Sequence, residues 1–263
     1  MLQPAQEAAA PLLQSRDARG VLTLTLNRPR AFNALNAALL DALQVAVDAA
    51  AADESLRVLV LAAHGPAFCA GHDLKEMRAE PSLGYYEDLF ARCGRFMQSL
   101  QALAVPVVAR VQGMATAAGC QLVAQCDLAL AADSAQFATS GVNYGLFCAT
   151  PAVALSRNIG RKAAFEMLAT GAFVSAGEAQ ARGLINRAVA PEALDAALDE
   201  LLESLLAKPR TALAMGKALF YRQLEEGQAA AYADAQQTMA HNMMQDCALD
   251  GVQAFIEKRK PKF

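Results

Sequence analysis

Two short stretches combine small and polar residues in a way that could serve chemistry at the backbone. The stretch MATAAGCQL, residues 114–122, follows an apolar run and opens a segment with helical spacing at Ala118. The N-terminus of a helix presents free N–H groups and the positive end of the helix dipole, so this turn favours an anion or a polarised oxygen. Small residues there would let a ligand reach the backbone. The second stretch, AFCAGHDL at residues 67–74, contains His72 among similar small residues.

Three polar side chains in these stretches are candidates for a chemical role. His72 could act as a general base through its imidazole. Gln121 can hold a water molecule or a carbonyl group by hydrogen bonds, but its amide cannot accept a proton at neutral pH. Asp73 is expected to cap a short helix that follows it, rather than to take part in chemistry.

The elements that position these stretches alternate between strand-like and helix-like segments. The expected strands are residues 21–26, 57–61, 107–111 and 127–131. The expected helices between them are residues 35–51, 85–103 and 118–126. Apolar strands that alternate with helices indicate an α/β fold of βα units whose strands are buried on both faces. Residues 114–122 then form a turn from a strand into a helix.

From residue 151 onward the pattern is mainly helical. The expected helices are residues 161–170, 175–182, 191–207 and 210–226, with a break at Lys208-Pro209. The Ala-rich residues 1–18 are predicted to form a flexible N-terminal tail. We therefore divide the chain into that tail, a core over residues 19–195 and a C-terminal helical region over residues 196–263.

The composition excludes several classes of function. The chain has 263 residues, 55% of them apolar, which is enough for a sizeable core, and its net charge of -3 provides no basic surface for nucleic acid. Its longest strongly apolar run, residues 58–63, is far shorter than the roughly 20 residues that cross a bilayer, so we expect no membrane partner. The six cysteines form no CxxC pair or zinc-ligand spacing. With no secretion signal before them, they predict reduced thiols, no metal site and a cytoplasmic location.

Six motifs are spread over nearly the whole chain: LNRP at 26–29, NALN at 33–36, AFCAGHDL at 67–74, VQGMA at 111–115, CDLA at 126–129 and FIEKRK at 255–260. In order and spacing they resemble the motifs of the crotonase (enoyl-CoA hydratase/isomerase) superfamily. Three further segments, GHDLKE at 71–76, AAGCQL at 117–122 and GLFC at 145–148, are most similar to one subgroup of that superfamily.

The resemblance implies a fold, a ligand and an assembly. The fold would be the ClpP/crotonase-like spiral of ββα repeats, with a helical C-terminal region that assembles homotrimers or hexamers built as dimers of trimers. The ligand would be an acyl-CoA thioester, and the activity that of a lyase or isomerase of the hydratase/isomerase group. No cofactor is implied beyond the coenzyme A that is part of the substrate.

The resemblance also implies roles for individual residues. In the superfamily two backbone N–H groups stabilise the thioester oxygen when an enolate or tetrahedral species forms, and these correspond to the N–H groups of His72 and Ala118. Lys75 matches a residue near the phosphates of coenzyme A, and Phe255 with Lys258 matches a C-terminal pair that reaches the coenzyme A, often that of a neighbouring subunit. The remaining expected contacts to coenzyme A are those of Arg30, Ala31, Ala34 and Ala70.

The two glutamates that hydratases of the superfamily use for proton transfer have no counterpart here. Gln121 stands at the position of the first glutamate and Gly141 at that of the second. The aspartate nucleophile of the dehalogenases corresponds to Ala149, which argues against aspartyl-ester chemistry. Hydration by two glutamates is therefore not expected.

Three functions remain open. The chain could be a lyase or isomerase that acts on an enoyl-CoA with an unusual base. It could decarboxylate a malonyl-type CoA ester, since carbon dioxide leaves and two amides hold the enolate without an obligatory base. It could also bind acyl-CoA without catalysis. Tyr144 could donate a hydrogen bond to an enolate or simply pack, Cys148 could be a nucleophile or an inert buried thiol, and Glu76 could turn inward or face solvent.

Overall fold

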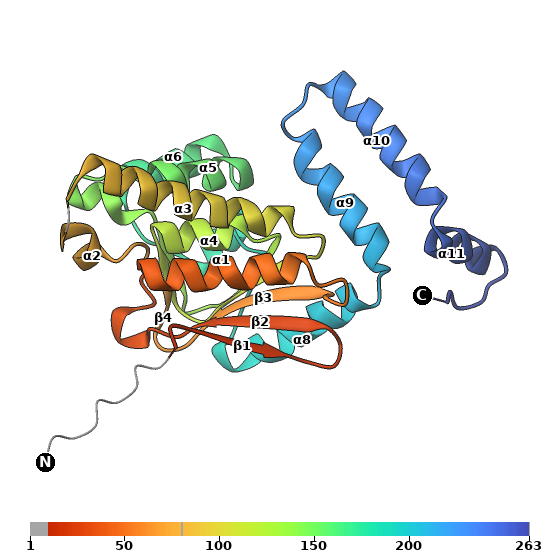
Figure 1. Cartoon of the computed structure of the whole chain (residues 1–263), viewed down its shortest axis with the longest axis horizontal. Helices are drawn as coiled ribbons and strands as arrows, with labels where there is room; N and C mark the ends of the chain where they lie inside the picture. Colours follow the sequence, from red (N-terminus) through yellow and green to blue (C-terminus); the bar gives the residue numbers. More distant parts are fainter. Residues whose placement is uncertain (1–9, 80, 263) are drawn as a thin grey trace, which may run out of the picture.

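The computed structural model describes residues 10–79 and 81–262, and their strands form two sheets (Figure 1). The larger sheet has six strands in the order β1-β2-β3-β5-β7-β10, with β1 antiparallel to β2 and the other pairs parallel. Its strands are β1 (Leu12–Arg16), β2 (Val21–Leu26), β3 (Val58–Ala63), β5 (Val107–Val111), β7 (Leu128–Ala132) and β10 (Arg187–Val189). All six residues of β3 are buried, as expected for an interior strand with both faces covered.

The smaller sheet carries the turns that build the site. Its order is β4-β6-β8-β9, where β4 is Ala67–Cys69, β6 is Met114–Thr116, β8 is Gln136–Ala138 and β9 is Val174–Ser175. Strands β4, β6 and β8 run parallel, so their carboxyl ends meet at one edge of the sheet. The segments that leave this edge are residues 70–72, 117–118 and 139–141.

Three successive repeats of the chain each add one strand to the larger sheet, then one to the smaller sheet, and then form helices. Strands β3 and β4 lead into α2 (Leu74–Ala79) and α3 (Leu83–Ala102). Strands β5 and β6 lead into α4 (Ala118–Gln125), and strands β7 and β8 lead through η2 (Ser140–Tyr144) into α5 (Ala149–Asn158). The predicted α/β spiral of ββα repeats is thus confirmed.

The larger sheet has a hydrophobic layer on each face, because side chains alternate along its strands. Leu59 and Leu61 belong to the main core beneath the helical layer of α1 (Ala37–Ala51), α3 and α4. Val58 and Val60 belong to a second cluster that α8 (Leu194–Leu206) covers from the other side.

Side-chain caps set two helix starts that sequence spacing placed slightly too early. Helix α1 begins at Ala37 rather than at residue 35, because the Asn36 side chain accepts a hydrogen bond from the Leu39 N–H at 3.1 Å. Helix α7 (Ala176–Arg182) begins after Ser175, which forms a reciprocal capping box with Glu178.

The predicted N-terminal tail over residues 1–18 is wrong for residues 12–16, which form β1. Leu12 pairs with Leu26 and Arg16 with Leu22, so β1 extends the sheet at its edge. Only Leu12 of this strand is buried, and backbone hydrogen bonding rather than an alternating apolar pattern therefore stabilises it. Residues 1–9 of the predicted tail lie outside the described residues.

Helix α8 packs on the larger sheet through Leu194, Leu198 and Leu202, so the core extends past the boundary that we placed at residue 195. Along the chain, the helices that follow β8 and precede α8 are α5, α6 (Arg161–Thr170) and α7. The described 3-10 helices are η1 (Pro29–Ala31), η2 and η3 (Pro191–Ala193). No helix in the described part of the chain is long and apolar enough to cross a membrane.

The last helices form an arm that stands away from the core in Figure 1. They are α9 (Arg210–Gln223), α10 (Gln228–Met243) and α11 (Asp246–Ile256), and no residue of α9 or α10 is buried. One polar cluster anchors α9: the Lys217 ammonium lies 2.7 Å from the Asp127 carboxylate and donates to the carbonyls of Leu100 and Val105. The Tyr221 hydroxyl donates to the same carboxylate at 2.6 Å. The arm is therefore fixed at its base and open along its length.

Candidate functional site

Two turns of the smaller sheet press against each other at the floor of the site. A Cβ atom on Gly119 would lie 2.0 Å from the carbonyl oxygen of Cys69, so only glycine allows α4 to approach β4 this closely. A Cβ atom on Gly71 would lie 3.2 Å from the backbone nitrogen of Ala118. The backbone after β4 therefore touches the backbone that opens α4.

Where these two turns meet, the N–H groups of His72 and Ala118 differ from those of their neighbours in their hydrogen bonding. The Ala117 N–H donates to the Ala138 carbonyl at 2.9 Å and the Asp73 N–H to the Leu35 carbonyl at 3.1 Å. In the described part of the chain, the N–H groups of His72 and Ala118 donate to no backbone carbonyl. Ala117 has a φ of 50°, which is strained for a residue with a side chain and aims the first turn of α4. Both free N–H groups belong to residues that line a cavity.

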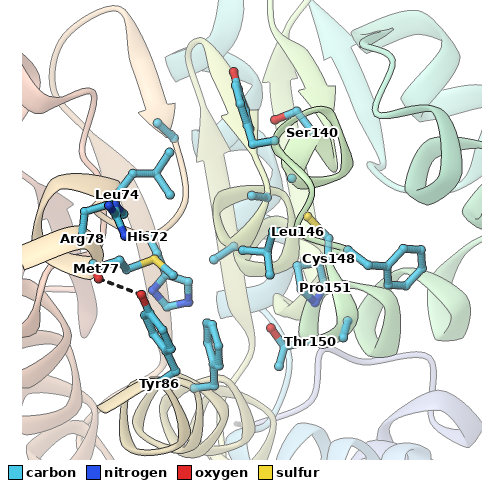
Figure 2. A pocket seen from close by; sticks show the side chains of 18 residues that line it. His72, Leu74, Met77, Arg78, Tyr86, Ser140, Leu146, Cys148, Thr150 and Pro151 are labelled. Carbon is cyan, nitrogen blue, oxygen red and sulfur yellow. Dashed lines mark hydrogen bonds between the residues drawn. The ribbon is translucent and has the colours of Figure 1, made fainter. Parts of the chain in front are cut away.

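That cavity has a volume of about 450 Å³ and a mostly apolar lining. Figure 2 shows His72, Met77 and Tyr86 on one side and Leu146, Cys148 and Pro151 on the other. Its described lining residues are Ala70, His72, Leu74, Met77, Arg78, Tyr86, Phe90, Ala117, Ala118, Ser140, Gly141, Tyr144, Leu146, Phe147, Cys148, Ala149, Thr150 and Pro151. None of these residues is an aspartate or a glutamate, and Arg78 is the one lysine or arginine among them.

His72 lines this cavity, and its imidazole is neutral. Both ring nitrogens are inaccessible to solvent and have no hydrogen-bond partner among the described residues. The ring packs edge-on against Phe90, with the ring centres 5.5 Å apart. Burial lowers the pKa of His72 to about 4, against a smaller raising effect of the Leu35 backbone.

Of the two positions where hydratases have a glutamate, one lies outside the cavity and the other lines it. Gln121 is only 4% exposed, does not line the cavity, and its side-chain oxygen has no hydrogen-bond partner in the described structure. Gly141 does line the cavity. A Cβ atom on Gly141 would lie 2.4 Å from the Leu146 carbonyl oxygen and 2.8 Å from the sulfur of Cys148, so this backbone leaves no room for a side chain.

The two carboxylates nearest in sequence to His72 are engaged with helix termini. Asp73 accepts hydrogen bonds from the N–H groups of Lys75 and Glu76, which confirms its capping role, and forms an ion pair with Arg28 at 3.0 Å. Partial burial raises the pKa of Asp73, but Arg28 and the N–H groups together hold it below its usual value. The Glu76 carboxylate accepts a hydrogen bond from the Ala37 N–H at 2.9 Å. It therefore binds the first turn of α1 and does not line the cavity.

The structure brings part of the predicted coenzyme A set together. Ala70 lines the cavity, and its N–H donates to the Phe32 carbonyl at 3.0 Å, so the segment from Arg30 to Ala34 lies beside the site. Ala34 is buried and Ala31 half-buried, whereas the side chains of Arg30 and Lys75 are exposed.

Phe255 and Lys258 do not join this set within one chain. Phe255 is 86% exposed at the end of α11, and Lys258 follows in a left-handed backbone conformation. In Figure 1, α11 and α2 lie at opposite ends of the molecule.

Sequence reasoning expected pocket walls from residues 83–96 but did not identify which side chains form them. Met77 and Arg78 come from α2, and Tyr86 and Phe90 lie one turn apart on α3. The Tyr86 hydroxyl donates to the Met77 carbonyl at 3.0 Å and thereby joins the two helices. The spacing of Tyr86 and Phe90 by four residues marked one helix face but did not reveal which cavity that face lines.

The remaining predicted groups have simple environments. Tyr144 is 77% exposed at the cavity rim, and burial raises the pKa of the Cys148 thiol, against a smaller lowering effect of the Gly141 backbone. The six cysteines are free thiols. Across residues 10–79 and 81–262, no group of three or more histidine, cysteine, aspartate or glutamate side chains could hold a metal ion.

We predict that Gly141→Ala lowers the free energy of unfolding by about 1–3 kcal/mol, because the new methyl group must displace the Leu146 carbonyl or the Cys148 sulfur. The measurement is urea denaturation. Gly84→Ala in α3 is the matched control, since nothing lies within 4 Å of a Cβ atom there, and it should leave stability equal or slightly higher. Equal effects of the two substitutions would contradict the proposed clash.

We also predict a pH dependence of stability that is specific to His72. In the unfolded chain the imidazole binds a proton near pH 6.5, whereas in the folded chain its pKa is about 4, so protonation between these values favours unfolding. Stability is retained above pH 6.5 and falls as the pH drops through this window, by about 2 kcal/mol at pH 5. Urea denaturation of the wild type and of His72→Phe at pH 7 and pH 5 measures the difference, and parallel losses in both would refute it.

Comparisons with known proteins identify the family of the chain. The family model described as enoyl-CoA hydratase/isomerase matches residues 16–263. The mitochondrial enoyl-CoA hydratase domain-containing protein 3 of Rattus norvegicus is 43% identical over 260 residues, which cover 98% of this chain and 87% of the rat protein. The crystal structure of that protein from human aligns with a TM-score of 0.92 at 40% identity, covering 96% of this chain and 100% of the human one.

A crystal structure of an enoyl-CoA hydratase from Mycobacterium smegmatis is also similar. It aligns with a TM-score of 0.95 at 65% identity and covers 96% of this chain and 98% of that one. The subgroup indicated by residues 71–76, 117–122 and 145–148 is the one to which the rat and human proteins belong, so that prediction is confirmed.

Proposed function

The chain belongs to the enoyl-CoA hydratase/isomerase family, and we propose that it binds an acyl-CoA thioester and stabilises the enolate or oxyanion form of its carbonyl oxygen with the backbone N–H groups of His72 and Ala118. The observation that carries this proposal is the contact of the two turns at the cavity floor, where both N–H groups lack a backbone acceptor. Removal of one such donor typically costs about 3–4 kcal/mol of transition-state stabilisation.

The surroundings of these N–H groups support the proposal. The cavity is mostly apolar, so a developing negative charge on oxygen would interact strongly with the two donors and with the N-terminus of α4. The cavity also opens beside the segment that contains Arg30, Ala31 and Ala34, where we place the adenine of coenzyme A, with Lys75 near its phosphates. Arg30 and Lys75 form no ion pair among the described residues, so both remain available for phosphate.

Decarboxylation of a malonyl-type CoA ester is the second candidate. The observation that favours it is the absence of aspartate and glutamate among the described lining residues. A carboxylate there would repel the carboxylate of such a substrate, whereas this cavity offers only Arg78 as a charged neighbour. Loss of carbon dioxide leaves an enolate, which the two N–H groups would stabilise without a base to start the reaction.

We further propose that the chain assembles as a homotrimer or as a hexamer of two trimers. The arm exposes many large apolar side chains that a second copy would cover: Phe220, Leu224, Tyr232, Met239, Met244, Leu249, Phe255 and Ile256. Because α11 lies far from the cavity of its own chain, Phe255 and Lys258 would reach the coenzyme A of a neighbouring copy.

The location of the protein remains the prediction made from its sequence. Free thiols support a reducing compartment such as the cytoplasm. The name of the rat relative places that relative in mitochondria.

The proposal predicts that binding polarises a thioester carbonyl. Cinnamoyl-CoA, whose conjugated system absorbs in the near ultraviolet, should shift its absorption maximum to longer wavelength when it binds, because two donors draw electron density toward the oxygen. Ala118→Pro removes one N–H at the first position of α4, where proline suits a helix, and should reduce the shift. Difference absorption spectroscopy measures both.

The matched control for that experiment is Gln228→Pro, which places proline at the first position of α10, outside the cavity. It should leave the spectral shift unchanged, and circular dichroism should show the same helix content for all three proteins. Tight binding of cinnamoyl-CoA without a shift would disprove the polarising role of the two N–H groups, and no binding would disprove the acyl-CoA proposal as a whole.

The second candidate predicts a specific product. Incubation with a panel of malonyl-, enoyl- and saturated acyl-CoA esters at high protein concentration should yield the decarboxylated ester, because only that reaction starts without a base. Mass spectrometry of the CoA products detects it. Hydrated or isomerised enoyl-CoA beside unchanged malonyl esters would argue against decarboxylation and for a base in the cavity.

A further inference from the structure

The described walls of the cavity carry one positive charge and no negative charge. Arg78 is the only lysine or arginine in the described lining, which contains no aspartate or glutamate. Because burial lowers the pKa of His72 to about 4, its imidazole adds no charge at neutral pH. Figure 2 shows Arg78 on the same side of the cavity as His72 and Leu74, with its side chain directed toward the cavity. The guanidinium is therefore the one charged group of the described lining that a bound acyl chain could meet.

No protein group in the described structure neutralises Arg78. Its side chain is exposed and forms no ion pair or hydrogen bond with any described residue. Other arginines nearby are engaged: Arg28, which contacts the start of α2, pairs with Asp73 at 3.0 Å, and Arg92 of α3 pairs with Asp41. Arg78 is therefore an accessible cation at the cavity whose charge is left for a ligand.

A guanidinium in this setting favours a carboxylate. Its planar fork can donate two parallel hydrogen bonds to the two oxygens of a carboxylate. The lining around it is mostly apolar, which strengthens such an ion pair relative to one on an open surface. An uncharged acyl chain in the cavity would instead displace water from the guanidinium without replacing its hydrogen bonds. The charge of Arg78 thus discriminates between acyl chains with and without a carboxylate.

The phosphates of coenzyme A are the other anions that Arg78 could bind. The cations that we assign to those phosphates, Arg30 and Lys75, are exposed and do not line the cavity. Arg78 differs from both because it lines the cavity beside apolar side chains such as Leu74 and Met77. Apolar surroundings suit an acyl chain and not a phosphate, so the position of Arg78 favours an anion on the acyl group.

We infer that Arg78 binds a carboxylate carried by the acyl group, and that the ligand of this site is the coenzyme A ester of a dicarboxylic acid. This inference rests on the proposed binding of an acyl-CoA at the N–H groups of His72 and Ala118. Those groups hold the thioester oxygen, and the acyl chain runs through the apolar cavity to the guanidinium. The recognised carboxylate stays on the ligand, unlike that of a malonyl-type ester, which decarboxylation releases. The cavity volume of about 450 Å³ lies within the range of roughly 300–1,000 Å³ that is typical of small-molecule sites.

The test compares pairs of ligands that differ in a single charge. The pairs are succinyl-, glutaryl- and adipoyl-CoA, each with the analogue in which a primary amide replaces the terminal carboxylate. Isothermal titration calorimetry measures the dissociation constants, and these saturated esters undergo neither hydration nor isomerisation during the titration. The wild type should bind at least one diacid ester about tenfold more tightly than its amide, less than a buried ion pair would give, because Arg78 is exposed to solvent. Added salt should reduce this preference.

Variants of Arg78 assign the preference to its charge. Arg78→Gln keeps a polar side chain without the charge, and should bind a diacid ester and its amide equally, with the affinity for the amide unchanged. Arg78→Lys keeps the charge without the planar fork and should retain part of the preference. Arg95→Gln is the matched control and should behave like the wild type, because Arg95 is exposed on α3, outside the cavity. Circular dichroism should show the same helix content in all four proteins.

The spectral shift of cinnamoyl-CoA separates this inference from the proposed function. A preference that Arg78→Gln loses and Arg95→Gln keeps, with the shift retained in both, supports the inference. A preference that persists in Arg78→Gln overturns it. Equal weakening of a diacid ester and its amide also overturns it, because the guanidinium then binds a phosphate or supports α2. A wild type that shifts cinnamoyl-CoA but prefers no diacid ester overturns the inference and leaves the proposed function intact, whereas a wild type that binds none of these ligands overturns both.

Discussion

The contact between Gly119 and the carbonyl oxygen of Cys69 sets the geometry on which the site depends. It lets the backbone of α4 rest directly on the end of β4, with no side chain between them. The same contact fixes the distance between the turn that carries His72 and the turn that carries Ala118. The two N–H groups are therefore positioned by the packing of a strand against a helix rather than by flexible side chains, and this is the kind of preorganisation that polar catalysis requires.

Much of this arrangement could be predicted because it is encoded locally. The turn that opens α4 and the cap formed by Asp73 each follow from residues close together in the sequence, whereas the ββα order was implied by the resemblance to the crotonase superfamily. Which side chains of residues 83–96 line the cavity could not be predicted, because Tyr86 and Phe90 do so only through the packing of α3 on α2. The reason for Gly141 also lay beyond the sequence, since the obstructing carbonyl belongs to Leu146 and its position depends on the fold of η2.

At both ends of the chain, contacts between residues far apart in the sequence determine features that the sequence pattern does not reveal. Helix α9 of the arm was predicted from its spacing, but its placement depends on Lys217 and Asp127, which are far apart in the sequence. Strand β1 was missed because a single buried residue gives it almost no pattern, while its hydrogen bonds to β2 are independent of side-chain type. The periodic spacing of apolar residues therefore indicates which side chains are buried, but not which strands pair through their backbones.

The crowding at Gly141 also bears on how this site relates to one with two carboxylates. Residues 121 and 141 distinguish this sequence from the two-glutamate pattern, and each position has its own obstacle to a carboxylate. A carboxylate at residue 141 needs the backbone of residues 146–148 to move first, and a carboxylate at residue 121 would be buried below the cavity floor. Each change alone therefore meets a structural obstacle that the present residue avoids. A site with two carboxylates would need a different backbone path around residue 146 as well as different residues at these two positions.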